Sequence, residues 1–249
     1  ELPKDLHITR MCCALVAISD GEIIKVAEPR VRYCPLSSSL YKDIKLFEEL
    51  DLELTKERIA KVVKRKISEF GHFTRKRELC RKIIDIPYGA SEMMMYALEK
   101  KGIDVTVTVC DGAGTIITNN PSLVQGIGAR MNGLFYTSPI AEVISRIKED
   151  DGYVVFPKTA KIDQIAGLEK AIELGYKNIA VTINGFAGED LDKIREIEKE
   201  TCASITSLVI CTTGLEKERA NEIKEYADLA WGCASFHVTL VSNFFVFSS

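Results

Sequence analysis

The second half of the chain alternates between strand-like and helix-like segments, and this alternation constrains the fold more than any other feature. Apolar runs typical of strands lie at residues 153–156, 178–183, 205–211 and 228–232, with amphipathic helical patterns between them at 164–174, 188–200 and 216–227. A strand that is followed by a helix and another strand returns to its sheet as a parallel strand through a right-handed crossover. The pattern therefore predicts a Rossmann-like parallel sheet from about Asp151 onward.

The first half of the chain predicts a β-hairpin followed by helices. Apolar alternations on both sides of Asp20-Gly21 are typical of two strands joined by a two-residue turn. Capping residues predict helices at residues 56–70 after Thr55, at 75–85 after Thr74 and at 92–101 after Ser91. The fold class is therefore α/β, with the Rossmann-like sheet preceded by a hairpin and a helical α+β half. We expect domains at residues 1–150 and 151–249, with one compact unit as the alternative.

The composition argues against several classes of protein. The chain has 249 residues, 46% of them hydrophobic, and a formal net charge of −3, so a general nucleic-acid binder is not expected. No apolar run approaches the roughly 18–20 residues that a membrane span needs, and no signal-peptide pattern is evident, so we expect a cytoplasmic protein. Eight cysteines in a chain of this length do not indicate a disulfide scaffold. They include no CxxC pair, which argues against a zinc ribbon. A homo-oligomer is left open.

Residues that follow the predicted parallel strands are the first candidates for a site, because ligands of such sheets bind beyond the carboxyl ends of the strands. Cys211 ends one predicted strand and Cys233 follows the last one. We therefore expect both cysteines at one edge of the sheet. The loop of Thr212, Thr213 and Gly214 is suited to binding an anion. The alternative is that both cysteines are small buried strand residues.

A glycine-rich segment in the middle of the chain is the second candidate. Valines alternate with threonines up to Cys110, which is typical of a half-buried strand, and the turn that follows leads to a hairpin partner. In the functional interpretation, Gly112, Gly114 and Thr115 bind an anion, Cys110 is a nucleophile or metal ligand, and Asp111 is an acid or base. A plain hairpin explains the glycines as well. We expect the turn at the rim of the main cleft, with Cys110 reduced and partly accessible.

The stretch from Lys56 to Lys82 carries eleven basic and three acidic residues. Such an asymmetry indicates either a solvated helical face or a docking face for an acidic protein, an anionic cofactor or RNA. In both cases we expect exposed basic side chains on the two predicted helices, at Lys61, Lys64, Arg65 and Arg75. His72, which lies between these helices, is expected to be a hydrogen-bonded loop histidine rather than a catalytic base.

Several distinctive stretches follow one another along the chain, among them VRYCPL, FGHFT, VCDGAGTIIT, LVQGIGARMNGL and YADLAWGCAS. In this order they resemble the archaeal methanogenesis marker protein 8 family, from about Ile18 to Ser235. The resemblance implies a cytoplasmic archaeal protein with an accessory role near methyl-coenzyme M reductase, and it supplies no catalytic residues. It also implies a charged helical tail, whereas this chain ends in FHVTLVSNFFVFSS. Either an edge strand replaces that helix or the end of the chain is altered.

Three functions are compatible with these observations. The first is an accessory or maturation factor of the methyl-coenzyme M reductase system that binds a thiophilic metal or an iron–sulfur cluster. Its ligands are the cysteines that end or follow predicted strands, namely Cys34, Cys110, Cys211 and Cys233. The second is an enzyme that acts on a phosphorylated or carboxylated small molecule, with Cys110 or Asp111 in catalysis. The third is a non-catalytic docking subunit that uses the basic helices.

Overall fold

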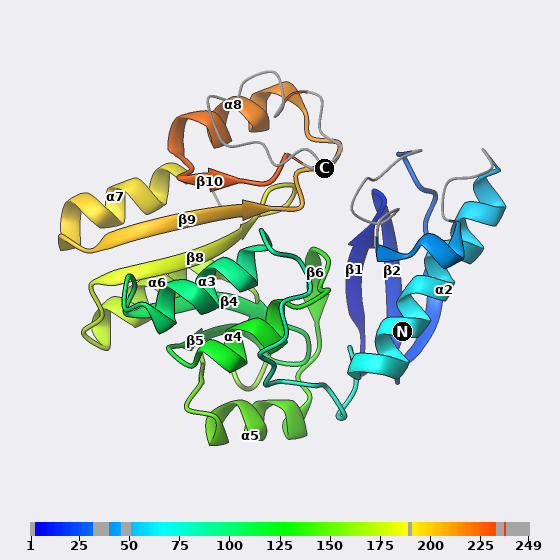
Figure 1. The fold of residues 1–249 in the computed structure, drawn as a ribbon, viewed down its shortest axis with the longest axis horizontal. Helices are drawn as coiled ribbons and strands as arrows, with labels where there is room; N and C mark the ends of the chain where they lie inside the picture. The colour runs from blue at the N-terminus through cyan, green and yellow to red at the C-terminus, as the bar shows by residue number, and fades with distance from the viewer. Residues whose placement is uncertain (1–2, 32–39, 46–50, 189–190, 233–236, 238–249) are drawn as a thin grey trace.

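The computed structural model describes residues 3–31, 40–45, 51–188, 191–232 and 237, so the unusual C-terminal segment lies outside it except for His237. Two β-sheets lie side by side, the N-terminal sheet A at the right of Figure 1 and the larger sheet B at the left. Sheet A is antiparallel in the order β3-β2-β1-β6. Its strands are β1 (His7–Met11), β2 (Ala14–Ser19), β3 (Glu22–Val26) and β6 (Leu134–Thr137).

Sheet B has the order β10-β9-β8-β4-β5-β7 in the described part of the chain. Its strands are β4 (Val105–Cys110), β5 (Gly114–Thr118), β7 (Tyr153–Val154), β8 (Asn178–Asn184), β9 (Ser204–Ile210) and β10 (Leu229–Ala230). The ladder from β10 to β4 is parallel, and β5 pairs antiparallel with both β4 and β7. This confirms the predicted parallel sheet for β8, β9 and β10, whereas the strand predicted at 153–156 is β7, which lies at the other edge and is antiparallel to β5. Because β4 and β5 precede residue 150, both predicted domains contribute strands to sheet B, and the domain boundary stays a prediction.

Helices cover both faces of sheet B. One face carries α6 (Gln164–Glu173), α7 (Leu191–Thr201) and α8 (Lys217–Tyr226), the other carries α3 (Ala90–Glu99) and α4 (Pro121–Gly128), and α5 (Ala141–Glu149) lies near β7. Side chains of β8 alternate between the two layers: Ile179 and Val181 pack with α6 to α8, and Ala180 packs with α3 and α4. No helix in the described part of the chain is long and apolar enough to cross a membrane.

One long helix, α2 (Leu52–Phe70), packs beside sheet A and follows the short 3₁₀ helix η1 (Lys42–Ile44) (Figure 1). It begins after Asp51, whose carboxylate accepts a hydrogen bond from a backbone N–H of the first turn at 2.8 Å. It ends at Gly71, as predicted, with a φ of 65°. The predicted start after Thr55 is about one turn late, because Thr55 lies inside the helix and its hydroxyl donates to the carbonyl of Asp51.

Residues 71–89, which we call the wall segment, are irregular, so the helix predicted at 75–85 is wrong. The backbone of the segment bonds to other parts of the chain: the N–H of Arg81 donates to a carbonyl of α4 at 2.9 Å. A Cβ added at Gly126 of α4 would lie 2.0 Å from the carbonyl oxygen of Leu79, so the segment lies directly on this helix. Local propensity favours a helix here, and tertiary packing overrides it.

The basic stretch is only partly on the surface. Lys61, Lys64 and Arg75 are exposed, as predicted, whereas Arg65 is half-buried in an ion pair with Asp43. The same stretch contributes three buried cations, which are Arg58, Lys66 and Arg77. An amphipathic pattern assigns every charge to the solvent face, but a long side chain at the edge of that face reaches neighbouring elements. The excess charge is therefore divided between the surface and the interior.

We expect Gly126→Ala to destabilise the protein, because the new methyl group would overlap the backbone of the wall segment. The expected loss is about 2 kcal/mol of unfolding free energy, measured by urea denaturation. Gly102→Ala is the control, since its Cβ would meet nothing closer than the carbonyl oxygen of Ala97 at 3.6 Å. Equal midpoints for the two variants would contradict the close packing of the wall segment on α4.

Candidate functional site

A cavity of about 500 Å³ lies between the two sheets. Asn184, Ile210 and Trp231 line it at the carboxyl ends of β8, β9 and β10, which is where parallel sheets bind their ligands. The end of β1 and the β1–β2 turn form the opposite side of the cavity. The remaining lining comes from the wall segment, the start of α3 and the chain between α4 and β6. The cavity thus gathers segments that are far apart in the sequence.

Two adjacent cysteines, Cys12 and Cys13, form the turn between β1 and β2, and both line the cavity. The ladder pairs Met11 with Ala14, so the turn has two residues, with φ of 52° and 60°. Turns of this kind favour glycine and asparagine, because side chains are unfavourable at positive φ. Adjacent residues of a strand would point to opposite faces of the sheet, whereas this turn brings both cysteines to one cavity.

Cys211 follows β9 and also lines the cavity, as its place after a strand suggested. Its φ is 60°, so all three cysteines of the described lining have a left-handed backbone, which costs about 1–3 kcal/mol at each position. A methyl group at Gly133 would lie 3.1 Å from the Cys211 Sγ and 3.0 Å from the Asn184 Nδ2. The thiol and the amide therefore lie next to the same glycine. Strain of this kind concentrates at functional sites.

Arg10 lies beside these thiols at the end of β1, with 8% of its surface exposed. Its Nη2 donates to the Sγ of Cys13 and to the carbonyl of Thr213, each at 2.9 Å. The guanidinium lies 3.9 Å from the ring centre of Phe186. Burial lowers the pKa of Arg10, and the neighbouring Cys13 and Cys211 oppose that decrease. No carboxylate among the described residues pairs with this cation, so the corner favours a negative charge.

Two further cations line the cavity. Lys66 donates to the side-chain oxygen of Asn132, and Arg130 pairs with Asp85 at 2.9 Å. Glu92 is the acidic residue of the described lining, and its carboxylate accepts hydrogen bonds from neighbouring groups of the wall segment, α3 and α4. Asp85, which does not line the cavity, offsets Arg130, so Arg10 and Lys66 outnumber Glu92 among the remaining charges of the described lining. The electrostatics therefore favour an anionic ligand.

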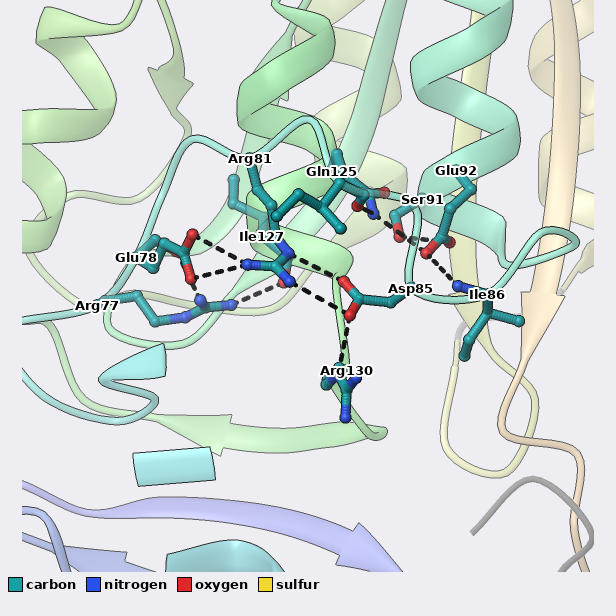
Figure 2. A network of polar contacts seen from close by, with 11 residues as sticks. Arg77, Glu78, Arg81, Asp85, Ile86, Ser91, Glu92, Gln125, Ile127 and Arg130 are labelled. Atoms are coloured by element: carbon teal, nitrogen blue, oxygen red, sulfur yellow. Dashed lines mark hydrogen bonds and ion pairs between the residues drawn. The ribbon is translucent and has the colours of Figure 1, made fainter. Parts of the chain in front are cut away.

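The wall segment is held in place by the polar network that Figure 2 shows. The carboxylate of Asp85 accepts from the Nε atoms of Arg81 and Arg130, each at 2.9 Å. Near the end of the segment, the indole N–H of Trp231 donates to the carbonyl of Tyr88 at 2.7 Å. The segment is therefore tied to the residues after α4 on one side and to the residue after β10 on the other.

Cys110 and Asp111, the predicted catalytic pair, are fully buried and are not among the lining residues. Asp111 accepts hydrogen bonds from the Nε of Arg77 at 2.8 Å and from the backbone N–H of Phe73 at 2.5 Å. Burial alone would raise the pKa of Asp111, but the Arg77 cation and the other donors outweigh it, and the pKa falls to about 2. Burial and the charge of Asp111 raise the pKa of the Cys110 thiol. The expected access of Cys110 from the cleft is wrong.

The glycine-rich turn joins β4 and β5 as a hairpin, in agreement with the simpler interpretation. Two of its N–H groups already donate within the protein, that of Gly112 to the hydroxyl of Thr137 at 2.7 Å and that of Thr115 to the carbonyl of Lys161 at 3.0 Å. An anion at Gly112, Gly114 and Thr115 would have to displace these bonds. The binding role of this turn stays a prediction.

The loop after β9 is closer to the cavity. Thr213 lines it, and Gly214 has a φ of 72° and lies against the Cys13 thiol. Thr212 is buried, and its hydroxyl donates to the carbonyl of Trp231. Of the predicted loop residues, Thr213 is therefore the one placed to meet a ligand.

The predicted four-cysteine metal site is not assembled by the residues that the structure describes. Cys34 and Cys233 lie outside them, Cys211 lines the cavity, and Cys110 packs in a separate apolar cluster. Among the described residues, no group of three or more His, Cys, Asp or Glu side chains is arranged to hold a metal ion. The metal site stays a prediction.

Sequence reasoning missed Arg10, Cys13 and Lys66 as members of the cavity. The local sequence hides the first two, because MCCALVAI is one continuous apolar run with no turn residue between Met11 and Ala14. No local pattern shows that the end of β1 faces β9, because that contact joins opposite ends of the chain.

His72 differs from the expected hydrogen-bonded histidine. Its side chain is fully buried beside Phe70 and Phe73, and neither ring nitrogen has a hydrogen-bond partner. Burial and the Arg77 cation lower the pKa of His72 well below its usual value, against the opposing charge of Asp111. The ring is therefore neutral and acts as packing between the two sheets.

Comparison with known sequences points to one archaeal group. The sequence profile described as "Uncharacterized protein conserved in archaea (DUF2099)" matches residues 7–244. "Uncharacterized protein MJ0054" of Methanocaldococcus jannaschii is 42% identical over 222 residues, which cover 89% of this chain and 74% of that protein. No solved structure matches the chain.

We expect Asp111→Asn to lower the free energy of unfolding by about 3 kcal/mol or more at pH 7, because it leaves the buried Arg77 without its counter-charge. The folded pKa of about 2 lies below the unfolded value of roughly 3.9. The ion pair therefore stabilises the wild type above about pH 4, and this contribution is lost as the pH falls toward 2. Urea denaturation from pH 7 to pH 3 measures both effects.

Asp43→Asn is the control for this variant, because the pair of Asp43 with Arg65 is near the surface and its removal should change the midpoint little. Two results would show that the buried pair does not order this region. One is a small effect of Asp111→Asn at pH 7, and the other is a loss of stability between pH 4 and pH 3 that is as large in the variant as in the wild type.

Proposed function

We propose that this chain, which belongs to the DUF2099 family of uncharacterised proteins conserved in archaea, binds an anionic small molecule in the cavity between its two sheets. The ligand class is a carboxylate or a phosphate ester. The site is the edge of sheet B at which β8 and β9 end, and not the glycine-rich turn between β4 and β5.

The buried guanidinium of Arg10 carries this proposal. It is 8% exposed, and its described partners are a thiol, a carbonyl and an aromatic ring. Removing a cation from water without an anionic partner is unfavourable by several kcal/mol. An anionic ligand would supply that partner, and it would form the charge-assisted bidentate contact for which a guanidinium is suited.

The thiols next to Arg10 are the candidate reactive groups of the site. Cys13 accepts a hydrogen bond from Arg10, and Cys211 is close enough to affect the pKa of the same guanidinium. A neighbouring cation stabilises a thiolate, which is the nucleophilic form of cysteine. We propose Cys13 and Cys211 as the reactive groups of an enzyme, in place of the buried Cys110 and Asp111.

A second candidate function is the binding of a thiophilic metal or an iron–sulfur cluster. The observation that favours it is that Cys12, Cys13 and Cys211, all with a left-handed backbone, line the same cavity, because thiolates are the preferred ligands of soft metals. The described residues do not form a complete metal site, so this candidate needs ligands from Cys34 or Cys233.

Both candidates are compatible with the resemblance to the methanogenesis marker protein 8 family. On that basis we propose that the protein acts in the archaeal cytoplasm as an accessory or maturation factor of the methyl-coenzyme M reductase system. The ordered sequence motifs support this narrower role. The basic residues Lys61, Lys64 and Arg75 are exposed and would be available for docking to such a partner.

The anion proposal is tested by calorimetry and thermal melting with phosphate and acetate as probes, with chloride at equal ionic strength as the reference. We expect the melting temperature of the wild type to rise with probe concentration. Arg10→Gln should weaken binding at least tenfold, because it removes the cation and keeps much of the side chain. Arg75→Gln, an exposed site, is the matched control. Equal binding by the Arg10 variant would refute the assignment of the site.

The metal candidate is tested by anaerobic purification, elemental analysis and an absorption spectrum. A bound iron–sulfur cluster predicts stoichiometric iron and a visible absorption band, both reduced in Cys211→Ser. Cys202→Ser is the control, since Cys202 is exposed and does not belong to the cavity lining. A colourless, metal-free wild type would exclude the cluster and leave anion binding as the function.

A further inference from the structure

The geometry points to a ligand with two anionic groups, one held beside Arg10 and the other held at Tyr41. This inference rests on the proposed function, since it takes anion binding at Arg10 as given. It adds a second binding point that Arg10 does not explain. The observations behind it are two polar groups of the cavity lining that are buried without hydrogen-bond partners.

Tyr41 is the first of these groups. Its side chain lines the cavity and is 3% exposed, yet its hydroxyl has no hydrogen-bond partner. Burial raises the pKa of Tyr41, so the hydroxyl is protonated and is a donor. Arg130 opposes that increase through its charge and its N–H groups, which can only donate toward the phenol oxygen, so the O–H itself is left without an acceptor. A buried hydroxyl without an acceptor is rare in a protein and points to a missing ligand.

The surroundings of Tyr41 define the charge of the group that it would bind. The Nζ of Lys66 lies 5.8 Å from the centre of the tyrosine ring, and Lys66 and Arg130 both line the cavity. An acceptor that meets the Tyr41 hydroxyl would therefore lie near Lys66 and near Arg130, which shares its charge with Asp85. This arrangement selects an anionic acceptor over a neutral one.

Asn184 is the second polar group without a partner. Its Oδ1 accepts from the backbone N–H groups of Phe186 and Ala187 at 3.0 and 3.3 Å, which fixes the orientation of the amide. Its Nδ2 is buried and has no hydrogen-bond partner. This donor lies near the Arg10 end of the cavity: the backbone N–H of Arg10 donates to the Gly133 carbonyl at 2.9 Å, and a Cβ at Gly133 would lie 3.0 Å from Nδ2. The guanidinium of Arg10 also stacks on the ring of Phe186, whose N–H donates to Asn184.

Neighbouring residues connect the two ends of the site. Asn132 accepts the hydrogen bond of Lys66 at the Tyr41 end, and Gly133 contacts Arg10 and Asn184 at the other. Apolar side chains, among them Met94, Met131 and Leu134, also line the cavity and suit a carbon body. The chemical class is therefore an organic dianion, either a dicarboxylate or a carboxylate that carries a phosphate.

The test compares dianions with matched monoanions. The probes are dicarboxylates from succinate to suberate, monocarboxylates of the same chain lengths, and phosphonoacetate, each titrated by calorimetry. We expect at least one dianion to bind the wild type about tenfold more tightly than its matched monoanion, which is the effect of one further hydrogen bond to a charged group. Whether a dicarboxylate or phosphonoacetate binds best identifies the second anionic group.

Two variants separate the binding points. Tyr41→Phe removes only the hydroxyl and should lower dianion affinity about tenfold while leaving monoanion affinity unchanged. Asn184→Asp keeps the oxygen that accepts from the backbone but replaces the donor with a negative charge, so it should weaken both classes at least tenfold. Tyr96→Phe is the control for the first variant, because Tyr96 is 60% exposed. Melting without ligand verifies that each variant is folded.

The outcomes distinguish the inference from the function on which it rests. If monoanions bind in an Arg10-dependent manner but dianions bind no better, or if Tyr41→Phe has no effect, the two-point ligand is overturned and anion binding remains. If neither class binds the wild type, both are overturned. A dianion preference that is lost in Tyr41→Phe and kept in Tyr96→Phe establishes the second binding point.

Discussion

The buried carboxylate of Asp111 connects the three parts of the fold that enclose the cavity. It lies in the turn between β4 and β5 of sheet B, and it accepts hydrogen bonds from Arg77 and Phe73 of the wall segment. The next residue, Gly112, donates to Thr137 of β6 in sheet A. One turn therefore ties both sheets to the wall segment. With its pKa near 2, Asp111 is charged at neutral pH, and Arg77 is the neighbour that makes a charge at this depth favourable.

The cavity that this framework encloses has an electrostatic imbalance. Arg10 is a buried cation, and the described residues that approach it most closely offer thiols and a carbonyl instead of a carboxylate. The two candidate functions differ in what neutralises this charge. In the first it is an organic anion, and in the second it is thiolates that also bind a metal. The backbone of Cys13 and Cys211 is left-handed, which is unfavourable for a residue with a side chain whichever group neutralises the charge.

The strand and helix pattern of the second half was predictable because it depends on local periodicity. Apolar residues at strand spacing alternate there with amphipathic helical patterns, and the predicted helix at 164–174 is α6, which Asp163 caps. A right-handed crossover then leaves one arrangement for successive strands, which is the parallel ladder of sheet B. From that sheet followed the edge at which Cys211 and Thr213 line the cavity. The sequence therefore predicted the part of the site that sheet B contributes, and not the part that sheet A contributes.

The sequence by itself determined the elements, the parallel sheet and the edge where a ligand would bind, because these depend on residues close together in the chain. Only the tertiary structure decided the rest. The wall segment has the pattern of a helix, yet it is irregular because it packs against Gly126 of α4. Cys110 ends β4 much as Cys211 follows β9, yet apolar side chains of α4 and α5 bury Cys110. Arg10 meets Thr213 through a contact between opposite ends of the chain. Local patterns show which face of an element is apolar, and only packing shows which distant segment covers it.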